Sequence, residues 1–326
     1  MIITKTPFRI SFFGGGTDYP EYFQKHGGAV LGTAVDKFAY VSVTRFYSRL
    51  FDYSIRIAYR DVECVRSIDE IRHAPFRECL RWCGISSDIE VNYTAELPSF
   101  SGLGTSSSFV VGLLCALYAF QSRSVRAMDL AYEAVEIERE VLKDSVGCQD
   151  QTFAALGGFN LIEFRSTRDF VVHRLPLSPQ RMNEFEQHLL ILDTGIRRRA
   201  GSIAARQIEK VEANSDRLRR MREMVDEGYS ILTDGGDLSR FGFLLDEAWS
   251  LKSSLDDLIS NDAIRSIYEE GREAGAFGGK LLGAGGGGFI LFFVDPDRRK
   301  AVRERLKRLE EIPVKVNAPG SNIIHM

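Results

Sequence analysis

The clearest chemical signal in the sequence is a short segment of two glycines and four hydroxyl residues: Gly102, Leu103, Gly104, Thr105, Ser106, Ser107 and Ser108. The alternating apolar run before it, at 89–95, predicts a strand, and the apolar stretch 109–117 after it predicts a buried helix. The segment then lies at a helix N-terminus, where free N–H groups and the helix dipole favour an anion. A polyphosphate fits this pattern. The alternative is a simple Ser/Thr cap after a flexible loop, for which one hydroxyl suffices.

Two further glycine clusters occur at 14–16 and 283–288. The second contains G-x-G-x-x-G, but it leads into the apolar run 289–294, which predicts a strand rather than the helix of a dinucleotide site. The Walker A pattern also fails, because Gly279-Lys280 continues with Leu281 and lacks the earlier glycine. We interpret 283–288 as backbone pressed against a ligand or another loop, with a plain β-hairpin loop as the alternative.

Glu138 stands in the middle of an apolar stripe on the helix predicted over 126–143. A carboxylate on a buried face is costly unless it is paired, protonated or bound to a metal. Magnesium held by one or two protein ligands together with phosphate oxygens fits this position. A buried salt bridge to an arginine is the alternative.

Three other charged residues occupy positions suited to chemistry. Asp150, just past the same helix, is placed to orient or deprotonate a substrate hydroxyl, with Asp144 as a competitor. Asp18 follows the first glycine cluster and is either an acceptor for sugar hydroxyls or the cap of the next helix. Arg9, on the first predicted strand, is a phosphate clamp or a solvent-facing residue.

Composition limits the class of protein. The 326 residues suffice for two domains, and 42 basic against 45 acidic residues leave a net charge of −3, which does not favour nucleic acid as a partner. No apolar stretch is long enough for a membrane span, and the N-terminus does not read as a signal peptide. Five cysteines without paired spacing indicate a reducing compartment, so we expect a cytoplasmic protein. The sequence is compatible with a homo-oligomer.

The order of predicted elements favours α+β over a doubly wound parallel sheet. We predict strands at 2–13, 38–46, 53–59, 88–96, 159–164 and 170–175, and helices at 67–83, 106–120 and 126–143. A second part contains a strand at 188–193, helical stretches at 201–232, 238–252, 262–274 and 297–310, and strands at 277–282, 289–294 and 312–316. With a boundary near 176–187, the predicted domains are 1–180 and 181–326.

Three motifs, in order, resemble those of the GHMP kinases (galactokinase, homoserine kinase, mevalonate kinase and phosphomevalonate kinase): 7–18 (PFRISFFGGGTD), 98–108 (PSFSGLGTSSS) and 280–288 (KLLGAGGGG). The resemblance covers nearly the whole chain. It implies ATP, Mg²⁺ and transfer of the γ-phosphoryl group to a small molecule. It also implies a two-domain fold, with an N-terminal α+β domain that contains a left-handed βαβ unit and a C-terminal ferredoxin-like domain.

The resemblance also implies roles for residues. Ser106 and Glu138 correspond to magnesium ligands, Asp150 to the catalytic aspartate, and Arg9 to a cation near the transferred phosphate. Residues 102–108 would hold the ATP phosphates. The expected substrate contacts are Gly15, Gly16, Thr17, Asp18, Gly285 and Gly286.

Within the family, the Gly-Gly-Gly-Thr-Asp variant and the segment 147–151 resemble the anomeric sugar kinases, above all those acting on D-glycero-D-manno-heptose 7-phosphate. This implies phosphorylation of the C1 hydroxyl to the 1,7-bisphosphate, for nucleotide-activated heptose and surface polysaccharide synthesis. Arg198, in an Arg197–Arg199 cluster, would bind the phosphate that the substrate already carries; a solvated helix start is the alternative. The other functions considered are kinase activity on an unphosphorylated sugar such as L-fucose, and a non-catalytic regulator that binds sugar and ATP.

Overall fold

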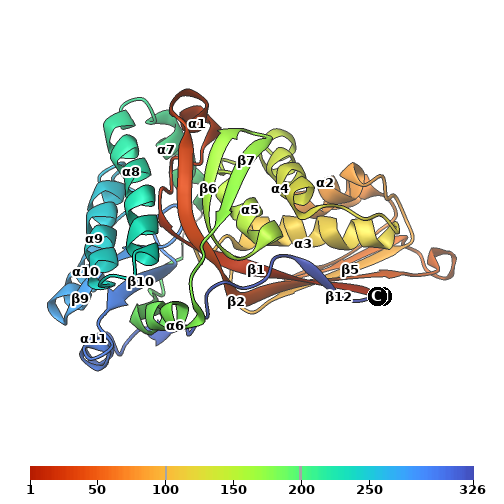
Figure 1. Cartoon of the computed structure of the whole chain (residues 1–326). Coiled ribbons are helices and arrows are strands. Elements are labelled where there is room, and N and C mark those ends of the chain that lie inside the picture. The colour runs from red at the N-terminus through yellow and green to blue at the C-terminus, as the bar shows by residue number, and fades with distance from the viewer. Residues whose placement is uncertain (100, 198–199) are drawn as a thin grey trace.

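The computed structural model describes residues 1–99, 101–197 and 200–326. Two groups of elements lie side by side in Figure 1, each built on its own sheet. The first group comprises β1 (Ile2–Phe13), α1 (Pro20–His26), β2 (Gly28–Arg45), β3 (Ile55–Ala58), β4 (Val62–Val65), α2 (Ala74–Trp82), β5 (Ile89–Ala95), α3 (Thr105–Phe120), α4 (Ala127–Glu136), α5 (Gln149–Leu156), β6 (Phe159–Ser166) and β7 (Asp169–Arg174). After α6 (Pro179–His188), the second comprises β8 (Leu189–Asp193), α7 (Ala200–Glu209), α8 (Ser215–Thr233), α9 (Ser239–Ser253), α10 (Asp262–Glu273), β9 (Ala276–Leu281), β10 (Phe289–Val294), α11 (Arg299–Arg305) and β11 (Glu310–Glu311).

The larger sheet has the order β12-β1-β2-β5-β3-β4, in which β12 comprises Asn322–His325, and β6 and β7 join it through β2. Strand β2 pairs with β1 along most of its length, with β6 through its first residues and with β5 through its last. Its pairings are antiparallel, whereas β3 and β5 are parallel neighbours connected through α2. The pair β3 and β5 is where the expected βαβ unit would lie, and its handedness stays a prediction.

The smaller sheet has the order β11-β8-β10-β9, and every pairing in it is antiparallel. Along the chain, β8 leads through the helices α7–α10 to the hairpin β9–β10, and α11 then leads to β11. This β-α-β-β-α-β sequence is the ferredoxin-like arrangement. The predicted α+β class and the ferredoxin-like second domain are thus confirmed.

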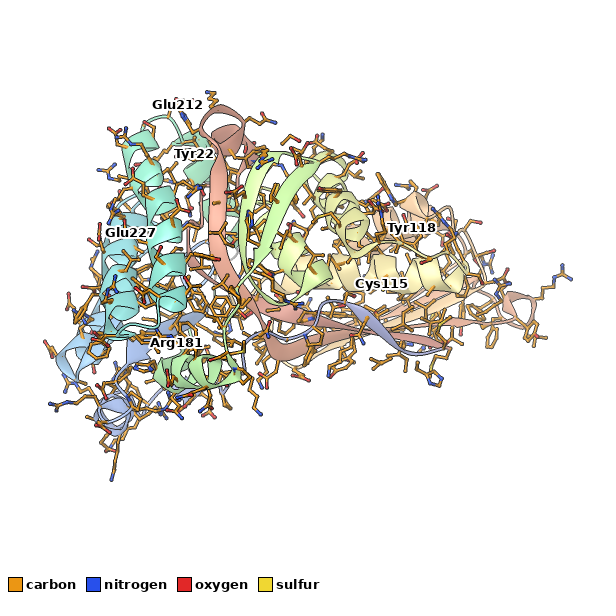
Figure 2. All side chains as sticks on the ribbon, in the orientation of Figure 1. Tyr22, Cys115, Tyr118, Arg181, Glu212 and Glu227 are labelled. Carbon is orange, nitrogen blue, oxygen red and sulfur yellow. The ribbon has the colours of Figure 1, made fainter. Side chains whose placement is uncertain are left out.

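The two sheets share a core rather than meeting at a thin interface. Phe12 of β1 lies 5.4 Å, between ring centroids, from both Phe185 of α6 and Phe241 of α9. Arg181, labelled in Figure 2, fixes α6 to the end of α8 because its Nη2 donates to the carbonyls of Ile231 (3.0 Å) and Gly236 (2.7 Å). Buried aromatic side chains contribute strongly to such a core.

The last strand, β12 (Asn322–His325), pairs with β1 and so returns the chain to the first sheet. The sequence-based boundary assigned this segment to the second domain. A strand was predicted at 312–316, but in this region the structure has an isolated bridge between Val316 and Val35. Pairing partners this far apart in sequence leave no local pattern.

Other boundaries differ from expectation for local reasons. β1 matches its predicted range, but β2 begins at Gly28, ten residues before the predicted strand, because its small residues pair on both sides with β1 and β6. The helix predicted at 67–83 begins only at Ala74, with Pro75 in its first turn. The strand β4 and the helix α5 were not predicted. No described helix is long and apolar enough to cross a membrane.

Candidate active site

The hydroxyl-rich segment forms the start of α3, a buried helix of 16 residues. The residue before the helix is Gly104, in the left-handed region at φ 74°, so no side chain caps the helix at that position. Ser108 donates its hydroxyl to Pro7 O at 2.8 Å, Ser107 is buried and Ser106 is exposed. The first-turn N–H groups and the Ser106 hydroxyl are therefore arranged as an anion site requires.

Arg9 of β1 connects this segment to α5. Its Nε donates to Asp150 Oδ1 at 2.8 Å, its Nη2 to Oδ2 at 2.6 Å and its Nη1 to Gly102 O at 2.6 Å. Its backbone N–H also donates to Leu103 O at 3.0 Å. Arg9 is 5% exposed, so the solvent-facing alternative is wrong. A bidentate guanidinium–carboxylate pair of this kind fixes both partners in orientation.

Gly104 allows the close approach of this ion pair. A Cβ there would lie 3.2 Å from Asp150 Oδ2 and 3.3 Å from Arg9 Cγ. Asp150 occupies the first turn of α5, a favourable place for an acidic side chain, and about a quarter of its side chain is exposed. The carboxylate is thus both oriented by Arg9 and open to a substrate.

Glu138 is fully buried in a π-helical turn (Ile137–Val141) that continues α4. Such turns are frequent at functional sites. Gln151 Nε2 donates to its Oε2 at 2.5 Å, while Oε1 has no hydrogen-bond partner. Burial raises the pKa of this carboxyl to about 7, against the opposing effects of the Ser107 hydroxyl and the Gln151 amide.

These features fit a magnesium ion at Glu138. Within the described ranges no lysine or arginine is paired with its carboxylate, which removes the salt-bridge alternative there. An orphaned, buried carboxylate oxygen beside hydroxyl groups is a suitable donor set for a hard cation that also takes water and phosphate oxygens. The buried Ser107 hydroxyl opposes the rise in the pKa of Glu138, whereas Ser106, in the same turn, is exposed. The assignment of Ser106 as the hydroxyl ligand stays a prediction.

Asp18 lies under the first glycine turn and is 2% exposed. Its Oδ1 accepts from Gly16 N at 2.9 Å. Helix α1 is preceded by Tyr19, so Asp18 is not its cap. Burial raises the pKa of this carboxyl, and the nearby Asp150 raises it further. Gly147 is required beside it, since a Cβ there would lie 1.9 Å from Asp18 Oδ2.

Not every predicted substrate contact faces the site. The Thr17 hydroxyl lies 2.8 Å from both Gly14 O and Ala29 O, and the residue is fully buried. It holds the turn in place, and its contact with a substrate stays a prediction. Gly15 lies between the unpartnered Ser11 Oγ and the Gln149 amide group.

The third glycine cluster connects β9 and β10, so it is a hairpin loop. Other loops of the chain also pack against it. A Cβ on Gly283 would lie 2.7 Å from Gly102 Cα, and one on Gly285 would lie 2.8 Å from Ile259 Cα. The N–H of Gly286 donates to Ile259 O at 2.8 Å. These loop contacts already explain why Gly283 and Gly285 lack side chains. Substrate contact by Gly285 and Gly286 stays a prediction.

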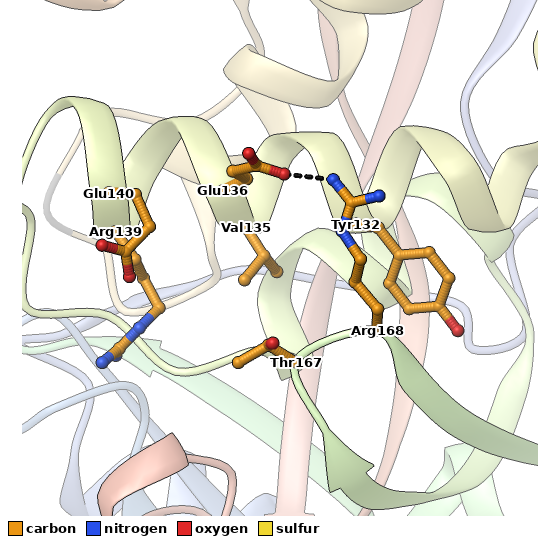
Figure 3. Close-up of a pocket in the computed structure, with 7 residues that line it drawn as sticks. All are labelled: Tyr132, Val135, Glu136, Arg139, Glu140, Thr167 and Arg168. Carbon is orange, nitrogen blue, oxygen red and sulfur yellow. Dashed lines mark hydrogen bonds and ion pairs between the residues drawn. The ribbon is translucent and has the colours of Figure 1, made fainter.

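Of the arginine cluster, the structure describes Arg197, which pairs with Asp193 at 2.5 Å. Arg198, the predicted phosphate contact, lies outside the described residues. A separate hollow, drawn in Figure 3, lies between α4 and the turn joining β6 to β7 and contains the Glu136–Arg168 ion pair. None of the predicted site residues lines it.

Sequence reasoning missed two buried lysines beside this site. Lys280 Nζ donates to Ser11 O at 2.9 Å and Phe12 O at 2.8 Å, and Lys252 Nζ donates to Gln207 Oε1 at 2.7 Å. Burial is the main cause lowering their pKa, to about 7 for Lys280 and about 8 for Lys252. The signal was available for Lys252, which falls at helical spacing from the apolar residues Leu245, Ala248 and Trp249, much as Glu138 falls within an apolar stripe.

Comparison with known proteins shows the family of the chain. The family described as GHMP kinases N terminal domain matches residues 65–158, and GHMP kinases C terminal matches residues 229–311. The D-glycero-alpha-D-manno-heptose 7-phosphate kinase of Campylobacter jejuni is 28% identical, over 94% of this chain and 93% of that protein. The bifunctional fucokinase/GDP-fucose pyrophosphorylase of Arabidopsis thaliana is also 28% identical, over 95% of this chain but 31% of that protein.

Among solved structures, a D-glycero-D-manno-heptose 1-phosphate kinase from Bacteroides thetaiotaomicron superposes with a TM-score of 0.82 at 24% identity. The match covers 100% of this chain and 99% of that one. The two family matches agree with the ferredoxin-like order of the second sheet and with the contact between the glycine segments at 102 and 283. The chain therefore belongs to the GHMP kinase family.

Proposed function

We propose that this kinase transfers the γ-phosphoryl group of ATP to the anomeric C1 hydroxyl of D-glycero-D-manno-heptose 7-phosphate, giving the 1,7-bisphosphate. The observation that carries the proposal is the Arg9–Asp150 pair held against the start of α3. It brings a cation and an oriented carboxylate to the edge of an anion site. The similarity to the Campylobacter jejuni kinase over nearly the whole chain supports the choice of sugar.

In the proposed step, the C1 oxygen forms a bond to the γ-phosphorus while the bond between that phosphorus and the β,γ-bridging oxygen breaks, and ADP leaves. Asp150 orients the C1 hydroxyl and accepts its proton. Arg9 offsets the negative charge on the transferred group, and the first turn of α3 holds the remaining phosphates. Catalysis of this kind depends mainly on positioning and charge stabilisation.

Glu138, with the hydroxyl of Ser106 or Ser107, would hold magnesium. When bound, the ion neutralises charge on the phosphate oxygens. Asp18 would accept hydrogen bonds from sugar hydroxyls, because its carboxylate is fixed by Gly16 N beside Asp150. Arg198 is our proposed contact for the 7-phosphate.

A second candidate is a kinase for an unphosphorylated sugar, favoured by the similarity to the Arabidopsis thaliana protein and to an L-fucokinase/L-fucose-1-P guanylyltransferase of Bacteroides fragilis. A non-catalytic regulator is disfavoured, because a sensor has no need of a buried, orphaned Glu138 next to an oriented Asp150.

The deciding experiment is an ADP-release assay with sugar 7-phosphates, sugar 6-phosphates and free hexoses. We expect kcat/KM to be highest for the heptose 7-phosphate, with the product phosphorylated at C1. Higher kcat/KM with a free sugar would favour the second candidate, and no ADP release with any acceptor would favour the regulator.

A further inference from the structure

Lys252 is a buried cation whose hydrogen-bond partners are all neutral, and the nearby Asp18 carboxylate acts on it without forming an ion pair. It lies in the last turn of α9, is 6% exposed, and donates to Gln207 Oε1 at 2.7 Å and more weakly to Gly15 O at 3.4 Å. No carboxylate of the described residues forms an ion pair with it. Burying an ammonium group without a carboxylate in direct contact is unfavourable. The position therefore favours a negatively charged partner from outside the chain.

Two other cations near this point, among the residues that the structure describes, already have partners. Arg9 makes its bidentate pair with Asp150, and Lys280 donates to the two carbonyls at the end of β1. An ammonium group has three donors, and Lys252 uses one of them in a short bond and another in a long one. Lys252 thus retains hydrogen-bonding capacity for a ligand.

The peptide unit between Gly15 and Gly16 connects Lys252 to Asp18. Its carbonyl oxygen accepts from Lys252, and its N–H donates to Asp18 Oδ1 at 2.9 Å. A Cβ on Gly16 would lie 3.7 Å from Lys252 Nζ, so the glycine turn passes close to the ammonium group. Asp18, which is expected to bind sugar hydroxyls, and the buried ammonium group of Lys252 therefore lie on either side of one peptide unit.

Unpartnered polar atoms mark the same turn as a ligand site. Ser11 Oγ and Gln149 Oε1 are buried without a hydrogen-bond partner, and both residues are 8% exposed. A Cβ on Gly15 would meet Ser11 Oγ at 3.6 Å and Gln149 Nε2 at 3.8 Å. Buried polar atoms normally have partners, so a ligand with several polar groups is the natural complement.

We propose that Lys252 is a further contact, besides Arg198, for the phosphate that the acceptor sugar already carries, while Asp18 on the adjoining glycine turn binds the sugar hydroxyls. The inference rests on the proposed function, in which the acceptor is a sugar phosphate. Gln207 then acts as a positioning residue, because its Nε2 donates to Ala284 O at 2.8 Å while its Oε1 accepts from Lys252. Gln207 thereby connects Lys252 to the third glycine cluster, 283–288.

The test compares Lys252→Met, Lys252→Gln and Lys252→Arg with the control Lys300→Met, Lys300 being exposed on α11. We expect the methionine and glutamine variants to raise KM for the sugar 7-phosphate by roughly 30-fold or more, the range of a lost charge-assisted hydrogen bond. KM for the dephosphorylated sugar should change by less than about threefold, and the arginine variant should retain most of the preference. An equal rise in KM for both sugars would overturn the proposal.

A second measurement does not depend on the sugar. With Mg·ADP saturating the nucleotide site, inorganic phosphate should raise the Tm of the wild type and of Lys300→Met through binding to the folded state. It should raise the Tm of Lys252→Met and Lys252→Gln much less. An equal rise in all variants, or none in the wild type, contradicts the role of Lys252. A wild type that prefers free sugars contradicts the proposed function instead, and the phosphate titration still decides on Lys252.

Discussion

The guanidinium of Arg9 contacts both carboxylate oxygens of Asp150, with Nε 2.8 Å from Oδ1 and Nη2 2.6 Å from Oδ2. The two residues are 141 positions apart, and Gly104 lies directly against the pair. The segment before α3, the guanidinium and the carboxylate therefore form one unit.

Asp150→Asn should lower kcat by about two orders of magnitude or more, because it removes both the proton acceptor and the counter-charge of Arg9. KM for ATP should change much less. Steady-state kinetics with Asp144→Asn as the control would check this, since Asp144 is an exposed aspartate near Glu138 that does not contact Arg9. Near-normal turnover of Asp150→Asn would exclude its role as the base.

Glu138→Gln should raise the Mg²⁺ concentration needed for half-maximal activity at least about tenfold, because a neutral amide is a poor ligand for a hard cation. Since the pKa of Glu138 is about 7, the wild type should bind Mg²⁺ more tightly at pH 8 than at pH 6, where the carboxyl is protonated. The variant should lose this part of the pH dependence. Magnesium titrations at both pH values measure it, and an unchanged requirement would mean that Glu138 holds no metal.

Gly147→Ala should impair sugar binding without touching the nucleotide site. The added methyl group would lie 1.9 Å from Asp18 Oδ2 and must displace that carboxylate. We expect KM for the sugar to rise by about tenfold or more, while KM for ATP stays within about threefold. If both constants moved together, the substitution would have disturbed the whole site and the specific role of Asp18 would not hold.

Lys280→Met should change how stability depends on pH. Burial lowers the pKa of Lys280 to about 7 from its usual value of 10.5, so between these values the unfolded chain holds a proton that the folded one has released. The free energy of unfolding contributed by this group therefore rises with pH across that range, with a slope of up to roughly 1.4 kcal/mol per pH unit. Denaturant unfolding of both proteins from pH 7 to 10 should show a flatter dependence for the variant. Parallel curves would contradict the assigned shift.

The sequence by itself determined which residues could do chemistry and which kind of element each lies on. The three glycine motifs, the hydroxyl-rich start of α3 and the misplaced charge of Glu138 are properties of short segments, where periodicity and residue type are informative. The α+β class and the family resemblance followed from the order of these segments.

Only the tertiary structure decided which groups meet. It paired Arg9 with Asp150, placed Gly147 under Asp18, turned Thr17 inward and returned β12 to the first sheet. It also placed Lys252 against the Gly15–Gly16 peptide, more than 230 residues away in the chain. Contacts between such distant residues arise from the packing of two sheets around a shared core, and no local pattern in the sequence records them.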